Sequence, residues 1–460
     1  MREHGSSTLL PDESGRVMER LAGLERVISP EVMRQVLIDT GRVNERDCPL
    51  SHEVMLWVVV AMGLLTDLSI RQVFQHARRW RRGKDTPVRS SLCMARQRLG
   101  VEPLRELFAR IVKPLATLET PGAFYHEYRL MGIDGCVFDV PDSAANAEFG
   151  RAVGGRGEGA FPQVRKLSLV ELGTHVEVAF VLSGWATGEQ TLAPQLWPLL
   201  PVDSLLLEDR GFFSFTHWES LISKVKLLCR AAQHLILKPQ QKLADGSYLS
   251  QIYADPRARE ADRDGLVVRV IEYTLDDPQR TGHGEVHRLL TNLLDEVQFP
   301  AHELIVLYHE RWEHELVFDE QKTHQDPRRA EKPAHLRSET PAGVRQEMYA
   351  LSLGHFIVRA LMFAAARTIV LDVDRLSFTN SLQILQCRLP ECDTRTPETL
   401  TQWYTNLLQE LLQTQHGPRR NRVNPRVIKR KMSKWPKKHH HHRRSKQLLK
   451  RFKESIVMAK

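Results

Sequence analysis

The sequence predicts an α/β protein with a mixed β-sheet at its centre. Residues 1 to about 118 have apolar side chains at the three-to-four spacing of helices, strand-like segments follow Pro121, and helical patterns return from Ala301. Strands first, and a mixture of strands and helices later, indicate an α/β core. At 460 residues the chain is long enough for two or three domains.

The N-terminal part, residues 1–118, is expected to form a helical domain, of a kind that commonly binds DNA. Four segments show helical spacing and have Ser or Asp near their starts: residues 10–24, 29–41, 51–69 and 69–83. A further stretch, residues 87–112, resembles a helix-turn-helix unit with a break at Gly100.

Basic side chains in this domain are candidate DNA contacts. Arg96 and Arg98 lie beside the break at Gly100, and Arg78 and Arg79 belong to a basic cluster around Trp80. A basic helix end that is simply solvated explains the cluster equally well, so this region alone leaves DNA binding open.

Composition changes after Pro121 to apolar or alternating segments separated by Gly and Pro. The expected strands of the core lie within residues 128–140, 165–173, 175–184, 203–209 and 224–232. A second strand-rich stretch, from Leu235 to about Thr291, interrupts this pattern and is expected to be an inserted β subdomain. Helical patterns return over residues 344–370 and 376–412.

Residues 417–460 form a strongly basic tail. They contain seventeen Lys and Arg and one acidic residue, Glu454, whereas the preceding 416 residues contain 48 basic and 55 acidic side chains. Such a concentration of positive charge favours a polyanion such as DNA, with a solvated disordered tail as the alternative. We interpret the run His439–His442 as part of this arm. Candidate DNA contacts in the tail are Arg419, Arg420, Lys429, Arg430 and Lys431.

Two aspartates stand at the ends of apolar runs. Asp134 follows an apolar run and precedes Gly135, and Asp209 follows a second run and precedes Arg210 and Gly211. A carboxylate at a strand end, beside a glycine that lets substrate approach, can present a metal ligand. An aspartate that caps a turn is the alternative, and it is the better explanation for either residue taken singly.

The segment YHERWEHELVFDEQK is more specific. Its residues Tyr308, Arg311, Glu315 and Lys322 are spaced so that a regular helix would place them on one face, within an arc of roughly 60°. A hydroxyl, a guanidinium, a carboxylate and an ammonium on one stripe suit a phosphodiester beside a metal ion, and a solvated face with ion pairs is the alternative. Five other carboxylates compete with Glu315: Glu303, Glu310, Glu313, Asp319 and Glu320.

These residues resemble a known family. Tyr-x2-Arg-x3-Glu-x6-Lys is the YREK signature of the insertion-sequence-4 class of DDE transposases, and Tyr308, Arg311, Glu315 and Lys322 match it without a gap. The segments IDGCVFDVPDS and LLLEDRGFFS resemble the blocks around the first and second aspartates of that family. The resemblance covers most of residues 30–438.

The resemblance implies an RNase H-like catalytic core with a β-rich insertion, a helical N-terminal domain and a basic C-terminal tail. The first acid then lies on the opening strand, the second after a later strand and the glutamate on a helix. The expected divisions are 1–118 (helical domain), 119–234 (core, first part), 235–291 (insertion), 292–372 (core, second part, with the YREK helix), 373–416 (helical region) and 417–460 (tail).

The resemblance also implies the chemistry. Asp134, Asp209 and Glu315 would be catalytic and would hold two Mg²⁺ ions, for which Mn²⁺ can substitute, while Tyr308, Arg311 and Lys322 would hold DNA phosphates. Some relatives stack a tryptophan of the insertion on a flipped base. The corresponding stretch here has no tryptophan, so that role would fall to His287 or Arg288.

The expected function is therefore a transposase that moves an insertion sequence by cut-and-paste. Its partners would be double-stranded DNA, as terminal inverted repeats and target, and a second copy of the chain in a synaptic complex. A nuclease of the same fold and a non-catalytic DNA-binding protein derived from a transposase are the alternatives. No run of 18 apolar residues and no secretory signal are evident, so we expect no membrane and a cytoplasmic, nucleoid-associated protein.

Overall fold

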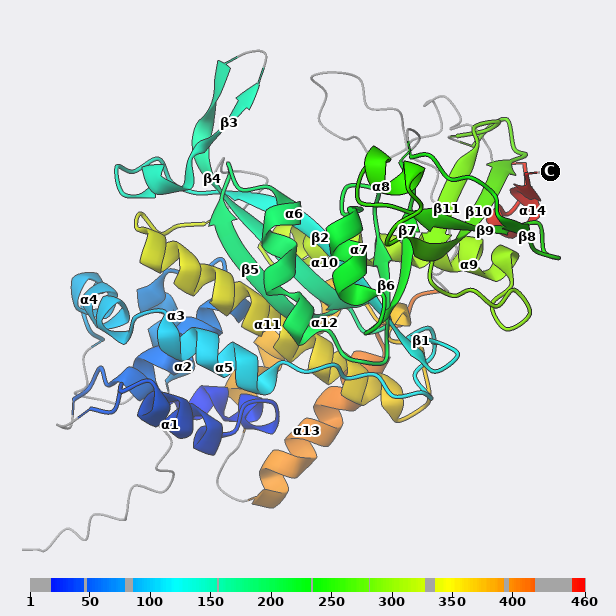
Figure 1. Cartoon of the computed structure of the whole chain (residues 1–460). Helices are drawn as coiled ribbons and strands as arrows, with labels where there is room; N and C mark the ends of the chain where they lie inside the picture. The colour runs from blue at the N-terminus through cyan, green and yellow to red at the C-terminus, as the bar shows by residue number, and fades with distance from the viewer. Residues whose placement is uncertain are drawn as a thin grey trace, which may run out of the picture. The chain divides into compact units, whose positions relative to one another are not determined.

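The computed structural model describes residues 18–44, 48–78, 86–154, 157–232, 235–280, 282–326, 336–392, 397–417 and 449–459 (Figure 1). The chain divides into two compact units, and neither is a continuous stretch of sequence. Unit 1 comprises residues 1–123, 135–192 and 315–416, and unit 2 comprises residues 124–134, 193–314 and 417–460. The chain therefore changes unit directly after Asp134 and directly before Glu315.

Unit 1 contains the N-terminal helices that the sequence predicts. They are η1 (Glu19–Arg26), α1 (Pro30–Asp39), α2 (His52–Leu64), α3 (Ile70–Ala77), α4 (Arg89–Leu99) and α5 (Glu102–Ile111). Serine hydroxyls cap three of them, since Ser29, Ser51 and Ser69 accept hydrogen bonds from backbone N–H groups of the first turn. The first expected helix is instead a 3-10 helix, and its first residues lie outside the described part of the chain.

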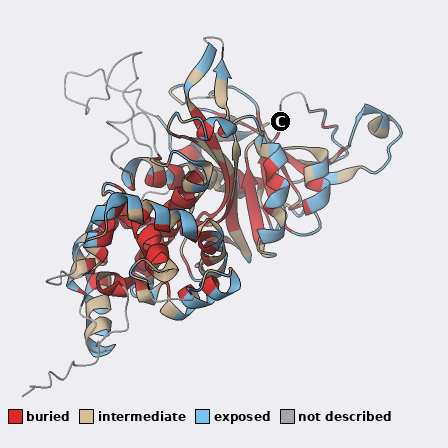
Figure 2. Ribbon diagram, turned by 90° about the vertical axis from the view of Figure 1, so that its left-hand side faces the viewer, coloured by how far each residue is buried: buried red, intermediate tan, exposed pale blue. Residues whose placement is uncertain are grey.

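The N-terminal helices share one core with three later helices, α11 (Pro341–Arg367), α12 (Phe378–Arg388) and α13 (Pro397–Leu412). Helix α11 lies along α2, and the two backbones approach so closely that a Cβ atom at Gly63 would stand 1.8 Å from the carbonyl oxygen of Ala350. Among the described helices, α11 has the length and apolarity of a membrane span, but 83% of its most apolar 18-residue window is buried inside the protein. Figure 2 shows buried residues on the inner faces of the helices and along the strands, with exposed residues on the outer faces.

Three strands and part of a fourth complete unit 1. They are β3 (Arg151–Gly154), β4 (Gly157–Glu171), β5 (Val176–Gly184) and the portion of β2 (Tyr128–Asp139) that begins at Gly135. Strand β4 pairs antiparallel with β3 and with β5, and β2 is its other neighbour in the sheet order.

Unit 2 contains the first portion of β2, up to Asp134, in parallel pairing with β6 (Ser204–Glu208). Strand β6 pairs parallel with β7 (Lys226–Arg230), and Leu205, Leu206 and Leu207 are fully buried. Helix α7 (Phe215–Leu221) connects β6 to β7. With β4 beside β2 in unit 1 and β6 beside it in unit 2, these strands form the RNase H-like core that the sequence predicts.

The stretch after β7 is rich in strands, as the sequence predicts. It contains β8 (Gln241–Lys242), β9 (Tyr248–Ile252), α8 (Pro256–Glu260), β10 (Leu266–Leu275) and β11 (His287–Thr291). These strands pair antiparallel in the order β11-β10-β9-β8, and β11 pairs antiparallel with β7. The stretch therefore extends the sheet of unit 2. Helix α9 (Ala301–Tyr308) follows it.

The described end of the basic tail is folded, in contrast to the solvated disordered tail considered as the alternative to a DNA-binding arm. Residues 449–459 fold back onto unit 2 as α14 (Phe452–Ser455) and β12 (Ile456–Met458), and β12 pairs antiparallel with β10. Asp277 accepts hydrogen bonds from the backbone N–H groups of Leu449 and Lys450. Apolar Phe452 and Ile456 distinguish this end from the basic residues before it, and that was the available signal in the sequence.

Candidate active site

Asp134 and Asp209 lie at the same end of two neighbouring parallel strands of unit 2. Gly132 of β2 pairs with Leu207 of β6, Asp134 lies two residues further along β2, and Asp209 is the first residue after β6. Neighbouring strands lie about 4.8 Å apart, and the two chains run in the same direction here. The structure therefore brings together the two aspartates that the sequence singles out.

A side chain of unit 1 lies beside Gly135, the glycine that follows Asp134. A Cβ atom at Gly135 would stand 2.3 Å from the Glu189 carboxylate, so in unit 1 the space is filled by a side chain of the protein. Glu189 forms an ion pair with Arg165 at 2.8 Å. Sequence reasoning missed Glu189, whose isolated position offered no signal.

Asp209 uses one carboxylate oxygen in a turn. The backbone N–H of Gly211 donates to Asp209 Oδ1 at 2.6 Å, which is the turn-capping role considered as the alternative. The described part of the chain offers Oδ2 no hydrogen bond, and the residue is half-buried. A capped aspartate with a second oxygen available is held in one orientation, so the turn and a metal-ligand role are compatible.

Arg311 and Tyr308 also lie at this strand end in unit 2. Arg311 Nη1 stands 3.4 Å from Asp134 Oδ2, and its side chain is 14% exposed. The hydroxyl of Tyr308 donates to the backbone carbonyl of Glu208, directly before Asp209, at 3.0 Å. Burial is the main cause that raises the pKa of Tyr308, so the phenol stays protonated. Tyr308 thus holds the end of β6 in place.

Cys229 and Glu208 lie beside Asp209, with Cys229 Sγ 3.5 Å from the Asp209 carbonyl oxygen. Burial, together with the charges of Glu208 and Asp209, raises the pKa of the Cys229 thiol well above its usual value, so it is an inert packing group. The Glu208 carboxylate is fully buried and lies 2.6 Å from His217 Nε2 on α7. These contacts fix the strand end without using the carboxylate of Asp209.

The YREK segment is helical but does not form one regular helix, which corrects the expectation of a single α-helical face. Helix α9 ends at Tyr308, a 3-10 turn η5 (His309–Arg311) follows, then α10 (Trp312–Asp319) and a π-helical turn η6 (Glu320–His324). Each change of winding rotates the later residues relative to the earlier ones. Spacing at 100° per residue therefore does not place Lys322 relative to Tyr308.

Glu315 and Lys322 belong to unit 1. Glu315 is half-buried on α10, and Lys322 Nζ donates to the carbonyl of Val137 on β2 at 2.7 Å and stands 4.9 Å from the centre of the Phe138 ring. The competing carboxylates are in other environments. Glu303 accepts a hydrogen bond from Tyr125, Glu313 is buried, Asp319 lies 3.2 Å from His324, and Glu320 is buried against Arg359.

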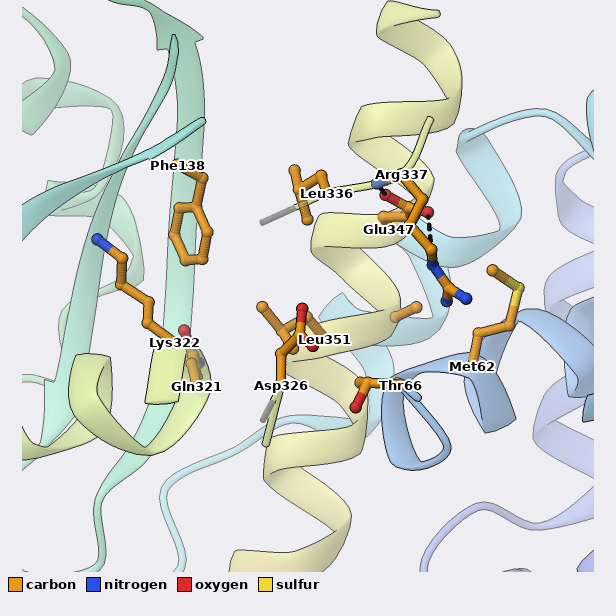
Figure 3. A pocket seen from close by; sticks show the side chains of 12 residues that line it. Met62, Thr66, Phe138, Gln321, Lys322, Asp326, Leu336, Arg337, Glu347 and Leu351 are labelled. Carbon is orange, nitrogen blue, oxygen red and sulfur yellow. Dashed lines mark hydrogen bonds and ion pairs between the residues drawn. The ribbon is translucent and has the colours of Figure 1, made fainter. Parts of the chain in front are cut away.

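A small, partly open pocket of about 30 Å³ is lined by Lys322 within unit 1 (Figure 3). Phe138 and Leu336 stand on its apolar sides, and Glu347 forms part of the wall on α11. The backbone N–H of Arg337 donates to the Glu347 carboxylate at 2.7 Å. Glu347 therefore fixes the backbone of Leu336 and Arg337, which also line the pocket.

The candidate DNA contacts of the N-terminal domain and the tail fall into three groups. Arg98 is exposed, and Arg78 stacks on Phe74 at 5.3 Å. Arg96 is 12% exposed and donates to Gln346 and to the Gly343 carbonyl, so its guanidinium joins α4 to α11. The predicted contacts outside the described residues are Arg79, Arg419, Arg420, Lys429, Arg430 and Lys431, together with the run His439–His442.

His287 and Arg288, the candidates for base stacking, are engaged within unit 2. His287 is 8% exposed, and the centre of its ring lies 5.1 Å from the centre of the Tyr273 ring. Burial lowers the pKa of His287. Arg288 donates to the carbonyl oxygens of Leu235 and Ala232. Neither ring nor guanidinium is presented as an open stacking platform in this conformation.

Comparison with known proteins gives consistent results. Residues 18–109 match the family of insertion element 4 transposase N-terminal domains, and residues 125–353 match the transposase DDE domain family. The transposase InsG for insertion sequence element IS4 of Escherichia coli (strain K12) is 28% identical over 431 residues, which is 90% of this chain and 93% of that protein. The putative transposase InsZ of the same organism is 28% identical over 186 residues, or 40% of this chain and 62% of that protein. A piggyBac transposase synaptic complex with hairpin DNA covers 85% of both chains at 12% identity, with a TM-score of 0.43.

Proposed function

The chain belongs to the insertion-sequence-4 family of DDE transposases, and on that premise we propose that Asp134, Asp209 and Glu315 are its catalytic residues. The protein is a transposase, a DNA-binding enzyme that depends on divalent metal ions. The observation that carries the assignment is that parallel pairing of β2 with β6 places Asp134 and Asp209, the residue after β6, at the same end of the two strands. Glu315 is included because it occupies the glutamate position of the YREK signature.

The donor set fits Mg²⁺ as the metal. Carboxylate oxygens are the ligands that Mg²⁺ prefers, and it binds through few protein ligands and retains water or phosphate oxygens. Asp134, Asp209 and Glu315 would hold the ions. When bound, two such ions activate the attacking oxygen and stabilise the leaving 3′ oxygen, and Mn²⁺ can substitute.

The basic residues would position the DNA. Arg311 stands beside Asp134, and its planar guanidinium can donate to two phosphate oxygens at once. Lys322 would supply a second cation for the backbone. Because the Tyr308 hydroxyl donates to the Glu208 carbonyl, we assign Tyr308 to support of the β6 end instead of the phosphate.

The remaining proposals concern partners and pathway. The helical N-terminal residues would read the terminal inverted repeats, and the basic residues 418–448 would add salt-dependent, sequence-independent affinity. The enzyme would act as a homodimer that holds two element ends and transfers them to target DNA by cut-and-paste. It would do so in the cytoplasm, at the nucleoid.

Substitution of Asp134 by Asn tests the assignment. On a labelled duplex with the element end, Asp134→Asn should abolish cleavage in Mg²⁺ while end binding stays near that of the parent protein. The matched control is Asp203→Asn, because Asp203 contacts Arg129 at the opposite end of the same two strands and should leave cleavage intact. Full cleavage by Asp134→Asn would remove Asp134 from the site.

A nuclease of the same fold is the second candidate, and the comparisons favour the transposase. The two differ in strand transfer. A transposase should join a pre-cut end to a supercoiled target plasmid, whereas a nuclease would cut the plasmid without joining.

A further inference from the structure

Buried charges fasten the π-helical turn that carries Lys322 to the core of unit 1. Glu320 opens the turn and is 4% exposed. Its Oε2 accepts hydrogen bonds from His355 Nε2 and Arg359 Nε, each at 2.9 Å. Its Oε1 pairs with Arg359 and lies 3.2 Å from His175 Nδ1. One carboxylate thus joins the turn to α11 and to the residue before β5.

In this network Glu320 forms an ion pair with Arg359 and accepts a further hydrogen bond from the neutral imidazole of His355. Burial by itself would raise the pKa of Glu320, but the guanidinium of Arg359 and the imidazole of His175 outweigh burial and hold that pKa well below its usual value. Burial lowers the pKa of His355, so its ring donates in the neutral form. Glu320 is therefore an anion at neutral pH.

The turn has two further attachments. The backbone N–H of Gln325 donates to the Glu320 carbonyl at 2.7 Å, which closes the π-helical turn. The Gln325 side chain donates to the carbonyl oxygens of Gly63 on α2 and Leu351 on α11. Between these ends, Gln321 accepts from the buried Lys166 ammonium at 3.0 Å. The turn is fixed at its start, middle and end.

Lys322 is the residue of the turn that belongs to the YREK signature. Its ammonium donates to the Val137 carbonyl on β2, three residues beyond Asp134 along the strand. π-Helical turns are rare and frequently occur at functional sites. Buried ion pairs contribute little net stability, because both charges lose their water. Because the charges that hold this uncommon turn add little stability, we explain them by a requirement to hold Lys322 in a defined position.

We propose that Glu320 is a positioning residue for DNA cleavage, which fixes the π-helical turn and thereby the ammonium of Lys322. Glu320 acts through Lys322 and does not touch DNA. The inference rests on the proposed function, in which Lys322 holds a backbone phosphate.

A double-mutant cycle on the full chain tests this inference. Glu320→Gln, Lys322→Ala and the double variant are compared in single-turnover cleavage of a labelled end duplex with saturating Mg²⁺. Glu320→Gln should slow cleavage about 10–100-fold when Lys322 is present, since misplacement of a positioned group has effects of this size. It should slow cleavage by less than about threefold in the Lys322→Ala background, because the effect then has no group to act through.

A stability-matched control separates position from folding. Leu411→Ala removes a buried side chain of α13 in the core of unit 1 and should lower the melting temperature while cleavage stays near the parent rate. If Glu320→Gln does not fold, Gln325→Met releases the other end of the turn without leaving a buried charge, and it enters the same cycle.

The outcomes are distinct. The inference is overturned if Glu320→Gln slows cleavage equally in the parent protein and in the Lys322→Ala background. It is also overturned if Leu411→Ala slows cleavage as much as Glu320→Gln does. Either result leaves the proposed function intact. A Lys322→Ala variant that cleaves at the parent rate overturns both the phosphate contact and the inference.

Discussion

The two halves of the YREK segment are held in different ways. Tyr308 and Arg311 reach the strand end of unit 2 through one backbone carbonyl and one partly buried ion pair. Glu320 and Lys322 are held in unit 1 by a buried ionic network and a π-helical turn. The difference shows that regular spacing in the sequence does not by itself define one functional face, because the contacts of each half determine where its side chains lie.

The largest expected effect separates two carboxylates of the second half. Glu315→Gln should reduce cleavage about 10³-fold or more, because loss of a residue that acts directly in catalysis has effects of this order. Asp319→Asn, four residues further on, should retain near-parent cleavage, since Asp319 is 52% exposed and contacts His324. Single-turnover cleavage with matched end binding measures both. Equal losses at the two positions would show that the spacing singled out the wrong glutamate.

The second prediction concerns pH and the first half. Burial, helped by the positive charge of Arg280 and the proximity of His287 and Arg311, lowers the pKa of His309 to about 4. The unfolded chain binds a proton near pH 6.5, so this contribution to stability is complete above pH 6.5 and is lost as the pH falls towards 4. The free energy of unfolding should fall by about 2 kcal/mol between about pH 7 and about pH 5 from this group.

Urea unfolding at several pH values checks the prediction with two variants. Between about pH 7 and about pH 5, His309→Leu should remove this pH dependence of the free energy of unfolding, and Phe452→Ala should reduce it. The centre of the Phe452 ring lies 3.5 Å from the centre of the His309 imidazole and shields the imidazole from water. His324→Gln, in the second half, is the control and should leave the slope in place. An unchanged slope in His309→Leu would assign the acid sensitivity to another group.

The sequence predicted most of the sheet and the acid pair because those features are local. Apolar runs specified β2, β6 and β7, and parallel pairing of β2 with β6 then brought Asp134 and Asp209 to the same end of these two strands. The π-helical turn could not be predicted, since it depends on Glu320 meeting Arg359 and His355 from α11. The docking of β12 on β10 depends likewise on residues far apart in the chain.

The third prediction tests whether Arg311 acts through its shape or only through its charge. Arg311→Lys retains the positive charge but replaces the planar guanidinium by an ammonium. It should slow cleavage about tenfold, because an ammonium cannot donate two parallel hydrogen bonds to two phosphate oxygens. The dependence of end binding on salt should stay unchanged, because the number of positive charges is the same. Arg345→Lys, at an exposed ion pair with Glu148 in unit 1, is the control.

The smallest expected effect is that of Tyr308→Phe, which removes only the hydroxyl that donates to the Glu208 carbonyl. Loss of one hydrogen bond from a buried group should lower the free energy of unfolding by about 1 kcal/mol. Cleavage should fall by less than about threefold if Tyr308 supports the end of β6 and more if it contacts the phosphate. Tyr404→Phe, on α13 in unit 1, is the control for removal of a tyrosine hydroxyl outside the segment. Urea unfolding and single-turnover cleavage are measured on the same preparations. A loss of cleavage without a loss of stability would show that Tyr308 contacts the DNA phosphate and does not support the end of β6.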